Sequence, residues 1–321
     1  VVGGIDYAKK CNGALCEHGK SVGHTATWRL DVSVDPPQWS AAPTMANALW
    51  YPTAIATHDG VFVAGHGEEA EPGFSCDTLL NPKNFQRYQR WDASPTGSFQ
   101  SWSNYKHFDT DPQCSALNLV SVGDYPRLHL LASGEVMMSN AFRTMFLDLK
   151  NPPPCTAIGP RWESEPVSQT GFWPRRGGNS VHLVYRDALG VRHEVVYNLG
   201  GTTGHDDDTC QADGSGAIVT NHVEKMTDPG PSKAWVDAPP LNHARYNHEV
   251  RFLLDGSLIV TGGNYWEELT GEPDICTFVH APERMSPPEL YGGAGTWTDL
   301  GVLAPQQHDR GYHAAGGLLP D

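Results

Sequence analysis

A single pattern of apolar and polar positions recurs along the chain: an apolar strand, a tight turn, a second apolar strand and a pair of small residues. Complete copies occupy residues 51–66, 125–140, 178–201 and 246–263. The chain opens on the end of a further copy and closes on the beginning of another. Copies that end at residues 4, 66, 140, 201 and 263 are 62, 74, 61 and 62 residues apart, and this near-constant period indicates an internal structural repeat.

Turn residues define a hairpin in the copies. Asp-Gly or Ser-Gly, as at Asp255-Gly256, supplies the positive φ that a tight hairpin needs. The Gly-Gly pairs allow neighbouring backbones to approach closely. A strand with Trp or Tyr follows each copy, for example around Trp28 and Trp39 or around Trp297. Four short strands per unit predict the blade of a β-propeller, whereas a β-sandwich lacks a constant period and a β-helix has a far shorter one.

The repeat also predicts the organisation of the chain. Its period exceeds the roughly 50 residues of a plain Kelch repeat, which implies long loops. We therefore expect an all-β fold, with an incomplete Kelch-type β-propeller over residues 1-321. The expected parts are a partial blade at 1-48, blades at about 49-120, 121-174, 175-242 and 243-307, and the first strand of a further blade at 308-321. Because an open ring exposes sheet edges, we expect the natural protein to be longer at both ends, or another segment to complete the ring.

Composition and charge narrow the possible partners. The net charge is −15 and no Lys/Arg cluster occurs, which argues against nucleic-acid binding. We expect no membrane span, because no stretch of about 18 apolar residues is present. None of the seven cysteines forms a CxxC pair, so structural disulfides in an oxidising compartment, and hence a secreted or cell-surface protein, are expected. The sequence leaves the disulfide pairing open.

Several segments carry a specific resemblance. They are Trp50-Tyr51-Pro52-Thr53, Tyr125-Pro126-Arg127-Leu128, Gly178-Asn179-Ser180-Val181, Arg245-Tyr246-Asn247-His248 and Arg310-Gly311-Tyr312-His313, the last followed by Leu318-Leu319-Pro320-Asp321. Together with the repeat, which covers nearly the whole chain, these segments resemble the propeller of the galactose oxidase and glyoxal oxidase family. The resemblance implies seven blades in the full-length protein, of which about five are represented here.

Members of that family are copper radical oxidases, and the resemblance implies a site for one copper ion. Tyr51 stands where the family has its Cys-linked radical tyrosine, Tyr312 at the axial tyrosine and His313 at the first histidine ligand. Tyr51 and Tyr312 both open the first strand of a blade, and equivalent positions on different blades converge near the propeller axis. Imidazole and phenolate ligands suit Cu(II).

The remaining members of the implied site fall outside the chain. The Cys of the Tyr-Cys thioether is expected about 12 residues before Val1, since the repeat has a known period. The second His ligand is expected in a C-terminal sandwich domain that residues 1–321 do not contain. The fragment alone is therefore expected to bind copper weakly and to be inactive.

Two hypotheses for the function follow. The first is oxidation of a primary alcohol, aldehyde or carbohydrate by O2 with release of H2O2. Galactose itself is disfavoured, because Leu49 replaces a family Arg and no Trp stands near Glu68. The alternative is a non-catalytic Kelch propeller that binds glycans or proteins. A Cys upstream of Val1 and a late downstream His would favour the enzyme.

Overall fold

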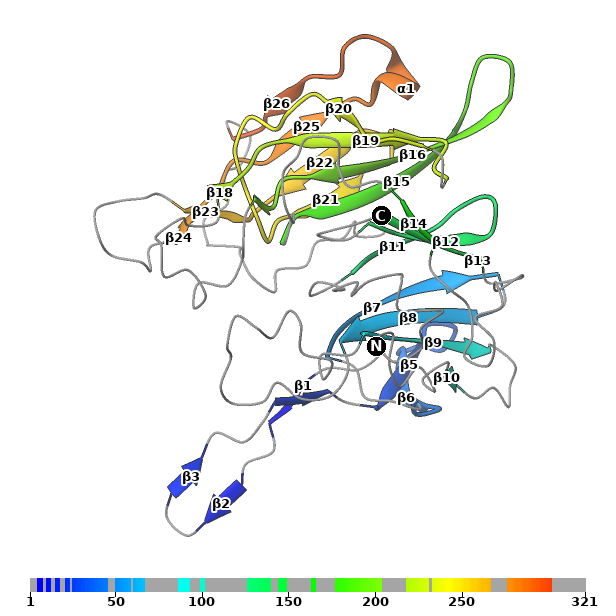
Figure 1. Cartoon of the computed structure of the whole chain (residues 1–321), viewed down its shortest axis with the longest axis vertical. Coiled ribbons are helices and arrows are strands. Elements are labelled where there is room, and N and C mark those ends of the chain that lie inside the picture. The colour runs from blue at the N-terminus through cyan, green and yellow to red at the C-terminus, as the bar shows by residue number, and fades with distance from the viewer. Residues whose placement is uncertain are drawn as a thin grey trace. The chain divides into compact units, whose positions relative to one another are not determined.

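A computed structural model describes residues 5–7, 10–12, 15–17, 21–23, 25–45, 50–58, 60–66, 86–92, 99–101, 126–139, 144–148, 163–165, 177–203, 218–230, 233–266 and 276–301. Over this part of the chain nearly all regular structure is β-strand (Figure 1), and the exception is the four-residue helix α1 (Pro288–Tyr291). Among these residues no helix has the length and hydrophobicity that a membrane-spanning segment requires.

Four sheets of four strands follow one another along the chain, and in each sheet the strands lie side by side in chain order. We call these sheets the first to fourth blades. The first contains β7 (Trp50–Thr57), β8 (Gly60–His66), β9 (Gln86–Asp92) and β10 (Phe99–Ser101). The second contains β11 (Arg127–Leu130), β12 (Glu135–Ser139), β13 (Thr144–Asp148) and β14 (Glu163–Glu165).

The other two blades have the same design and are described in more detail. The third contains β15 (Asn179–Arg186), β16 (Arg192–Leu199), β19 (Val223–Thr227) and β20 (Val236–Ala238). The fourth contains β21 (Glu249–Phe252), β22 (Leu258–Thr261), β25 (Glu283–Met285) and β26 (Trp297–Asp299). Neighbouring strands of both blades are antiparallel. Before the first blade, β5 (Thr27–Asp31) and β6 (Gln38–Ala42) form an antiparallel pair, the β5–β6 ribbon.

Small two-stranded ribbons occupy part of the long loops that the period predicts. β17 (Thr202–Thr203) pairs with β18 (Ile218–Val219), and β23 (Asn264–Trp266) pairs with β24 (Cys276–Phe278). Each ribbon begins directly after a Gly-Gly pair and separates the second from the third strand of its blade. Near the N-terminus β1 (Ile5–Tyr7) pairs with β4 (Ser21–Gly23), and the hairpin of β2 (Lys10–Asn12) and β3 (Leu15–Glu17) lies between them in sequence.

The first strands of successive blades lie next to one another. β7 contacts β11, and β15 contacts β21. Consecutive four-stranded sheets whose first strands adjoin are the arrangement of a β-propeller, in which the first strand of each blade is innermost. The all-β propeller class predicted from the repeat is thereby confirmed.

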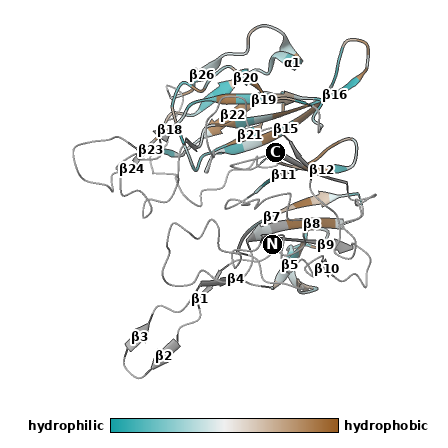
Figure 2. Ribbon diagram, in the orientation of Figure 1, coloured by the Kyte–Doolittle hydropathy of each residue, from teal (hydrophilic) through white to brown (hydrophobic). Residues whose placement is uncertain are grey.

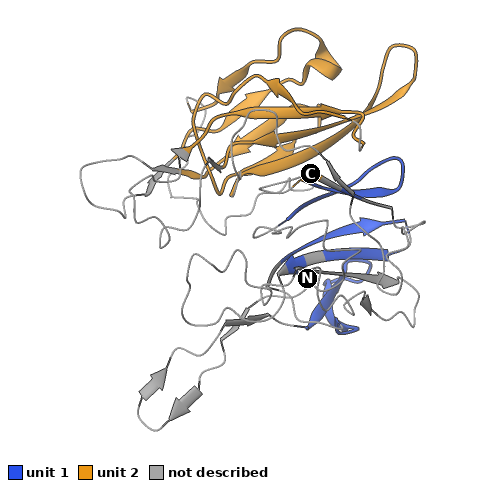
Figure 3. Ribbon diagram, in the orientation of Figure 1, with its two compact units in different colours: residues 1–138, 145–164 blue, residues 139–144, 165–321 orange. Residues whose placement is uncertain are grey.

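The chain divides into two compact units (Figure 3). Unit 1 contains residues 1–138 and 145–164, and unit 2 contains residues 139–144 and 165–321. Unit 2 includes the third and fourth blades. Each unit is considered by itself below.

An apolar core joins the third and fourth blades within unit 2. Its members are Val181, Leu183, Val195, Tyr197, Leu199, Val223, Ala238, Leu241, Val250, Leu258, Val260, Met285 and Trp297, each at most 9% exposed. Figure 2 shows hydrophobic residues along β16 and β22. From Glu194 onward β16 is buried at every position, because it is covered on both faces. Burial of apolar area at about 25 cal/mol per Å² makes this core the main source of stability in unit 2.

The Gly-Gly pairs allow the close approach that the sequence predicts. Gly200 has a φ of +54°, and a Cβ atom there would lie 2.5 Å from the carbonyl oxygen of Arg245. Gly263 has a φ of +88°, and its Cβ would lie 2.8 Å from the carbonyl oxygen of Tyr246. Any other residue would both strain the backbone and collide with the segment that leads into β21.

Candidate functional site

Tyr51 stands at an irregularity at the beginning of the first blade. It is the second residue of β7, which pairs with β8 in regular register from Thr53 to Thr57. Trp50 pairs with His66, but the register shifts between Trp50 and Thr53. The shift fits the sequence, because Pro52 has no backbone N–H to donate to the ladder. Such bulges redirect the strand and are common next to functional sites.

The other predicted copper ligands are not described. Tyr312 and His313 lie outside the described residues, and only the backbone of Tyr51 is described. The copper site formed by Tyr51, Tyr312 and His313 therefore stays a prediction. The equivalent positions in unit 2 are described in atomic detail, and they reveal how a blade begins in this fold.

Tyr246 occupies the position in the fourth blade that Tyr51 occupies in the first. Its backbone N–H donates to the carbonyl of Asn264 at 2.9 Å, and the N–H of Asn264 donates to the carbonyl of Tyr246 at 3.0 Å. The side-chain amide of Asn264 also donates to the Tyr246 hydroxyl at 2.6 Å. Tyr246 is half-buried. These bonds fix Tyr246 against the ribbon that follows Gly263, which is the packing role the sequence predicts for it.

The beginnings of two neighbouring blades meet at this level. The N–H of Asn247 donates to the carbonyl of Gly177 at 2.5 Å, and Asn247 has a φ of +54°. The side chain of Asn179 donates to the carbonyl of His248 at 3.0 Å. Within unit 2, equivalent positions that open the first strands of adjacent blades therefore come together, as the predicted site requires for Tyr51 and Tyr312.

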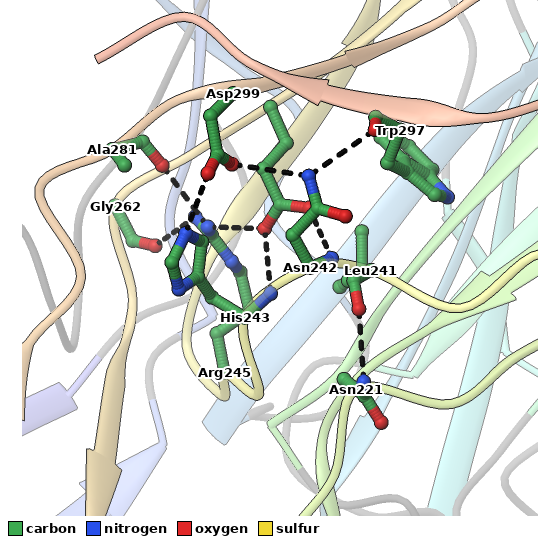
Figure 4. A network of polar contacts seen from close by, with 10 residues as sticks. Asn221, Leu241, Asn242, His243, Arg245, Gly262, Ala281, Trp297 and Asp299 are labelled. Carbon is green, nitrogen blue, oxygen red and sulfur yellow. Dashed lines mark hydrogen bonds and ion pairs between the residues drawn. The ribbon is translucent and has the colours of Figure 1, made fainter.

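A buried guanidinium lies directly before Tyr246 (Figure 4). Arg245 is fully buried, and it donates to the carbonyls of Gly262 at 2.9 Å and Ala281 at 3.0 Å. It also forms an ion pair with Glu283, with 2.5 Å between Nη2 and Oε1. Burial lowers the pKa of Arg245, and the Glu283 carboxylate opposes this shift. The charge is therefore compensated, as a buried ion must be.

Glu283 fixes the backbone of the same segment. One carboxylate oxygen accepts the N–H of Asn242 at 2.5 Å, and the other accepts the N–H of His243 at 3.2 Å. Glu283 comes from β25, the third strand of the blade, and is fully buried. The sequence analysis missed this residue, since the sequence does not identify which acidic residue 38 positions after Arg245 shares its buried site.

His243, Glu283 and Asp299 are the one group of three potential metal ligands within 4.8 Å of one another among the described residues. His243 Nε2 lies 3.2 Å from Asp299 Oδ2, and both side chains are partly exposed. The Glu283 carboxylate, however, is already bonded to Arg245 and to two backbone N–H groups. A cation would have to displace or face the guanidinium, so the arrangement fits an ion-pair network rather than a metal site.

The fold defines the chain as a β-propeller, and comparison with solved structures agrees. It is similar to a fungal alcohol oxidase of the AA5 family determined in complex with copper, with a TM-score of 0.58 and 16% identity over 92% of this chain and 53% of that one. It is also similar to YjhT, with a TM-score of 0.52 and 10% identity over 97% of this chain and 85% of that one. The chain thus spans about half the length of the oxidase. No protein-family model and no curated protein sequence matches it.

Proposed function

We propose that the chain is the propeller portion of a copper radical oxidase that oxidises a primary alcohol or aldehyde with O2 and releases H2O2. The observation that carries this proposal is the position of Tyr51, at a bulge that opens the first strand of a blade, in a fold similar to that of a copper alcohol oxidase. That similarity supports an oxidoreductase at the level of fold. The residues Tyr51, Tyr312 and His313 supply the argument for the chemistry.

The donor set of these residues fits copper. Two phenolates and an imidazole are ligands that Cu(II) accepts in tetragonal geometry. In unit 2 the equivalent positions of adjacent blades, Gly177 and Asn247, are joined by a hydrogen bond, which supports convergence of such positions. Tyr51, Tyr312 and His313 would hold the ion together with the Cys and the second His expected outside residues 1–321. When bound, copper would supply one-electron redox chemistry.

The reaction balances as RCH2OH + O2 giving RCHO + H2O2. An aldehyde would react as its hydrate, RCH(OH)2 + O2 giving RCOOH + H2O2. Tyr312, as a phenolate, would accept the proton of the substrate hydroxyl and so act as the general base. Tyr51, in its radical form, would take a hydrogen atom from the carbon that bears this hydroxyl.

A peroxide assay tests the proposal. The protein expressed from its complete coding sequence and loaded with copper should produce H2O2 from at least one member of a panel of primary alcohols and aldehydes. Tyr51→Phe should abolish turnover, and Tyr312→Phe should lower kcat by about 10²- to 10⁴-fold, the usual contribution of a general base. Tyr246→Phe is the matched control, because it changes the equivalent position of another blade and should keep turnover. Absence of peroxide from a folded, copper-loaded protein with every substrate would overturn the proposal.

A further inference from the structure

The β5–β6 ribbon presents an apolar face to solvent. Trp28 and Leu30 alternate along β5, and the register places Ala41 opposite Trp28 and Trp39 opposite Leu30. Alternate residues and directly opposed residues share a face of an antiparallel pair. On this face Trp28 is 50%, Leu30 39% and Trp39 56% exposed. Thr27, on the other face, is buried, so the large apolar side chains of the ribbon point outward.

In the third and fourth blades a Trp at the beginning of the fourth strand is buried against the preceding blade. Trp297 begins β26, is 5% exposed, and donates its indole N–H to the carbonyl of Pro239, just after β20, at 2.9 Å. Trp235 directly precedes β20, is 2% exposed, and donates to the hydroxyl of Thr144, the first residue of β13, at 2.6 Å. Each indole thus packs on, and bonds to, the sheet before its own.

Trp39 occupies the same position in the β5–β6 ribbon. It is the second residue of β6 and lies opposite Leu30, as Trp297 lies opposite Met285 in the fourth blade. An aromatic residue recurs at or just before the fourth strand of every sheet, namely Trp39, Phe99, Trp162, Trp235 and Trp297. The Met285 and Trp297 pair is 1% and 5% exposed, whereas the Leu30 and Trp39 pair is 39% and 56% exposed. The ribbon therefore has an interblade face without the blade that covers it elsewhere.

We propose that the apolar face of the β5–β6 ribbon is the docking surface for a further four-stranded blade, contributed by a segment of the protein outside residues 1–321. That blade covers Trp28, Leu30 and Trp39 with apolar side chains. It also offers a backbone carbonyl or a hydroxyl oxygen to the indole N–H of Trp39, as Pro239 and Thr144 do for the equivalent tryptophans. This inference is independent of any activity of the protein.

Hydroxyl-radical footprinting with peptide mass spectrometry tests the proposal. Oxidation of Trp39 should be at least about tenfold slower in the protein expressed from its complete coding sequence than in residues 1–321. Trp235 and Trp297, which are buried, should react slowly in both and serve as internal references. Equal, fast oxidation of Trp39 in both proteins would overturn the proposal. So would protection in residues 1–321 that rises with protein concentration, which indicates a second copy, or protection that requires added cellohexaose, which indicates a carbohydrate platform.

A pair of variants provides a second measurement. Trp39→Ser should lower the Tm of the complete protein by about 5–15 °C, the range for loss of a buried Trp in a chain of this size. The same change should leave the Tm of residues 1–321 nearly unaltered, because Trp39 is exposed there. Val236→Ser is the matched control, since Val236 follows Trp235 in a fourth strand and is 50% exposed. If Trp39→Ser has no more effect than Val236→Ser on the complete protein, no blade covers this face.

Discussion

The buried ion pair of Arg245 and Glu283 holds the segment that leads into the first strand of the fourth blade. Both side chains are fully buried, and Glu283 also accepts two backbone N–H groups. Removal of one partner leaves the other charge uncompensated in a medium of low polarity. A single carboxylate thus determines where Tyr246 stands, although the two residues belong to different strands.

Glu283→Ala should lower the free energy of unfolding by about 3–5 kcal/mol, because the Arg245 guanidinium would remain buried without its partner. Urea denaturation measures the change. Asp299→Ala is the control: its ion pair with His243 is exposed, and the loss should be at most about 1 kcal/mol. The explanation is wrong if both variants lose equally little.

His193 lies between two carboxylates at one end of the third blade. Its Nδ1 is 3.1 Å from Asp228 and its Nε2 is 3.4 Å from Asp187. The hydrogen bond to Asp228, followed by the bond to Asp187, raises the pKa of His193 above its ordinary value of 6.5. Protonated His193 is therefore favoured in the folded protein, so its stabilising effect is fully present below about pH 6.5 and is lost as the pH rises through the folded pKa.

The pKa of His193 should be measurable by NMR titration, and it should exceed 6.5. Asp228→Asn should move that pKa down, since the largest cause of the shift is removed. The Tm of the natural sequence should exceed that of His193→Gln at pH 5, and the difference should vanish at alkaline pH. A folded-state pKa at or below 6.5 contradicts this account. His182 offers an internal contrast, because burial lowers its pKa.

At the scale of elements, the hairpin of each blade could be predicted because its signals are local. Turn residues such as Asp255-Gly256 and the close packing of Gly200 and Gly263 depend on a few adjacent positions. The β17–β18 and β23–β24 ribbons could not be predicted, since their strands are separated by loops and their register depends on pairing at a distance. The Arg245 and Glu283 pair was missed for the same reason.

The β2–β3 hairpin makes one disulfide pairing testable. Its backbone register places Cys11 opposite Cys16, and opposed residues of antiparallel strands have Cα atoms about 4.5–5.5 Å apart. A disulfide spans such a distance. We expect Cys11 and Cys16 to be joined when the protein is made in an oxidising compartment.

Alkylation and mass spectrometry of the tryptic peptide 11–20, which contains both cysteines, check this pairing. The unreduced peptide should carry no iodoacetamide adduct and should be two hydrogens lighter than the thiol form, and reduction should allow two adducts. Cys16→Ser should leave Cys11 open to alkylation without reduction. Two adducts before reduction, or a crosslink to another peptide, contradict the pairing.

At the scale of the whole molecule, the fold alone does not select a function. The chain has a TM-score of 0.58 to a copper alcohol oxidase and 0.52 to YjhT, at 16% and 10% identity. A period of short strands and turns was enough to predict the propeller class, because many different sequences satisfy it. Function depends on the few residues grafted onto that frame. Tyr51, Tyr312 and His313 are therefore the positions at which the proposed activity succeeds or fails.

These positions lead to a prediction about the whole chain and its copper. Residues 1–321 contain three of the expected ligands, so their Kd for copper should exceed that of the complete protein by more than about 100-fold, since even the loss of groups that only orient ligands costs 10–100-fold. Competition with a chelator measures both values and discounts loose binding to a chain of net charge −15. His313→Ala should weaken copper binding by the complete protein, whereas His243→Ala, which changes a histidine of the ion-pair network, should not. Tight one-to-one binding and peroxide production by residues 1–321 alone would mean that the ligand set is complete within this chain and has been assigned wrongly.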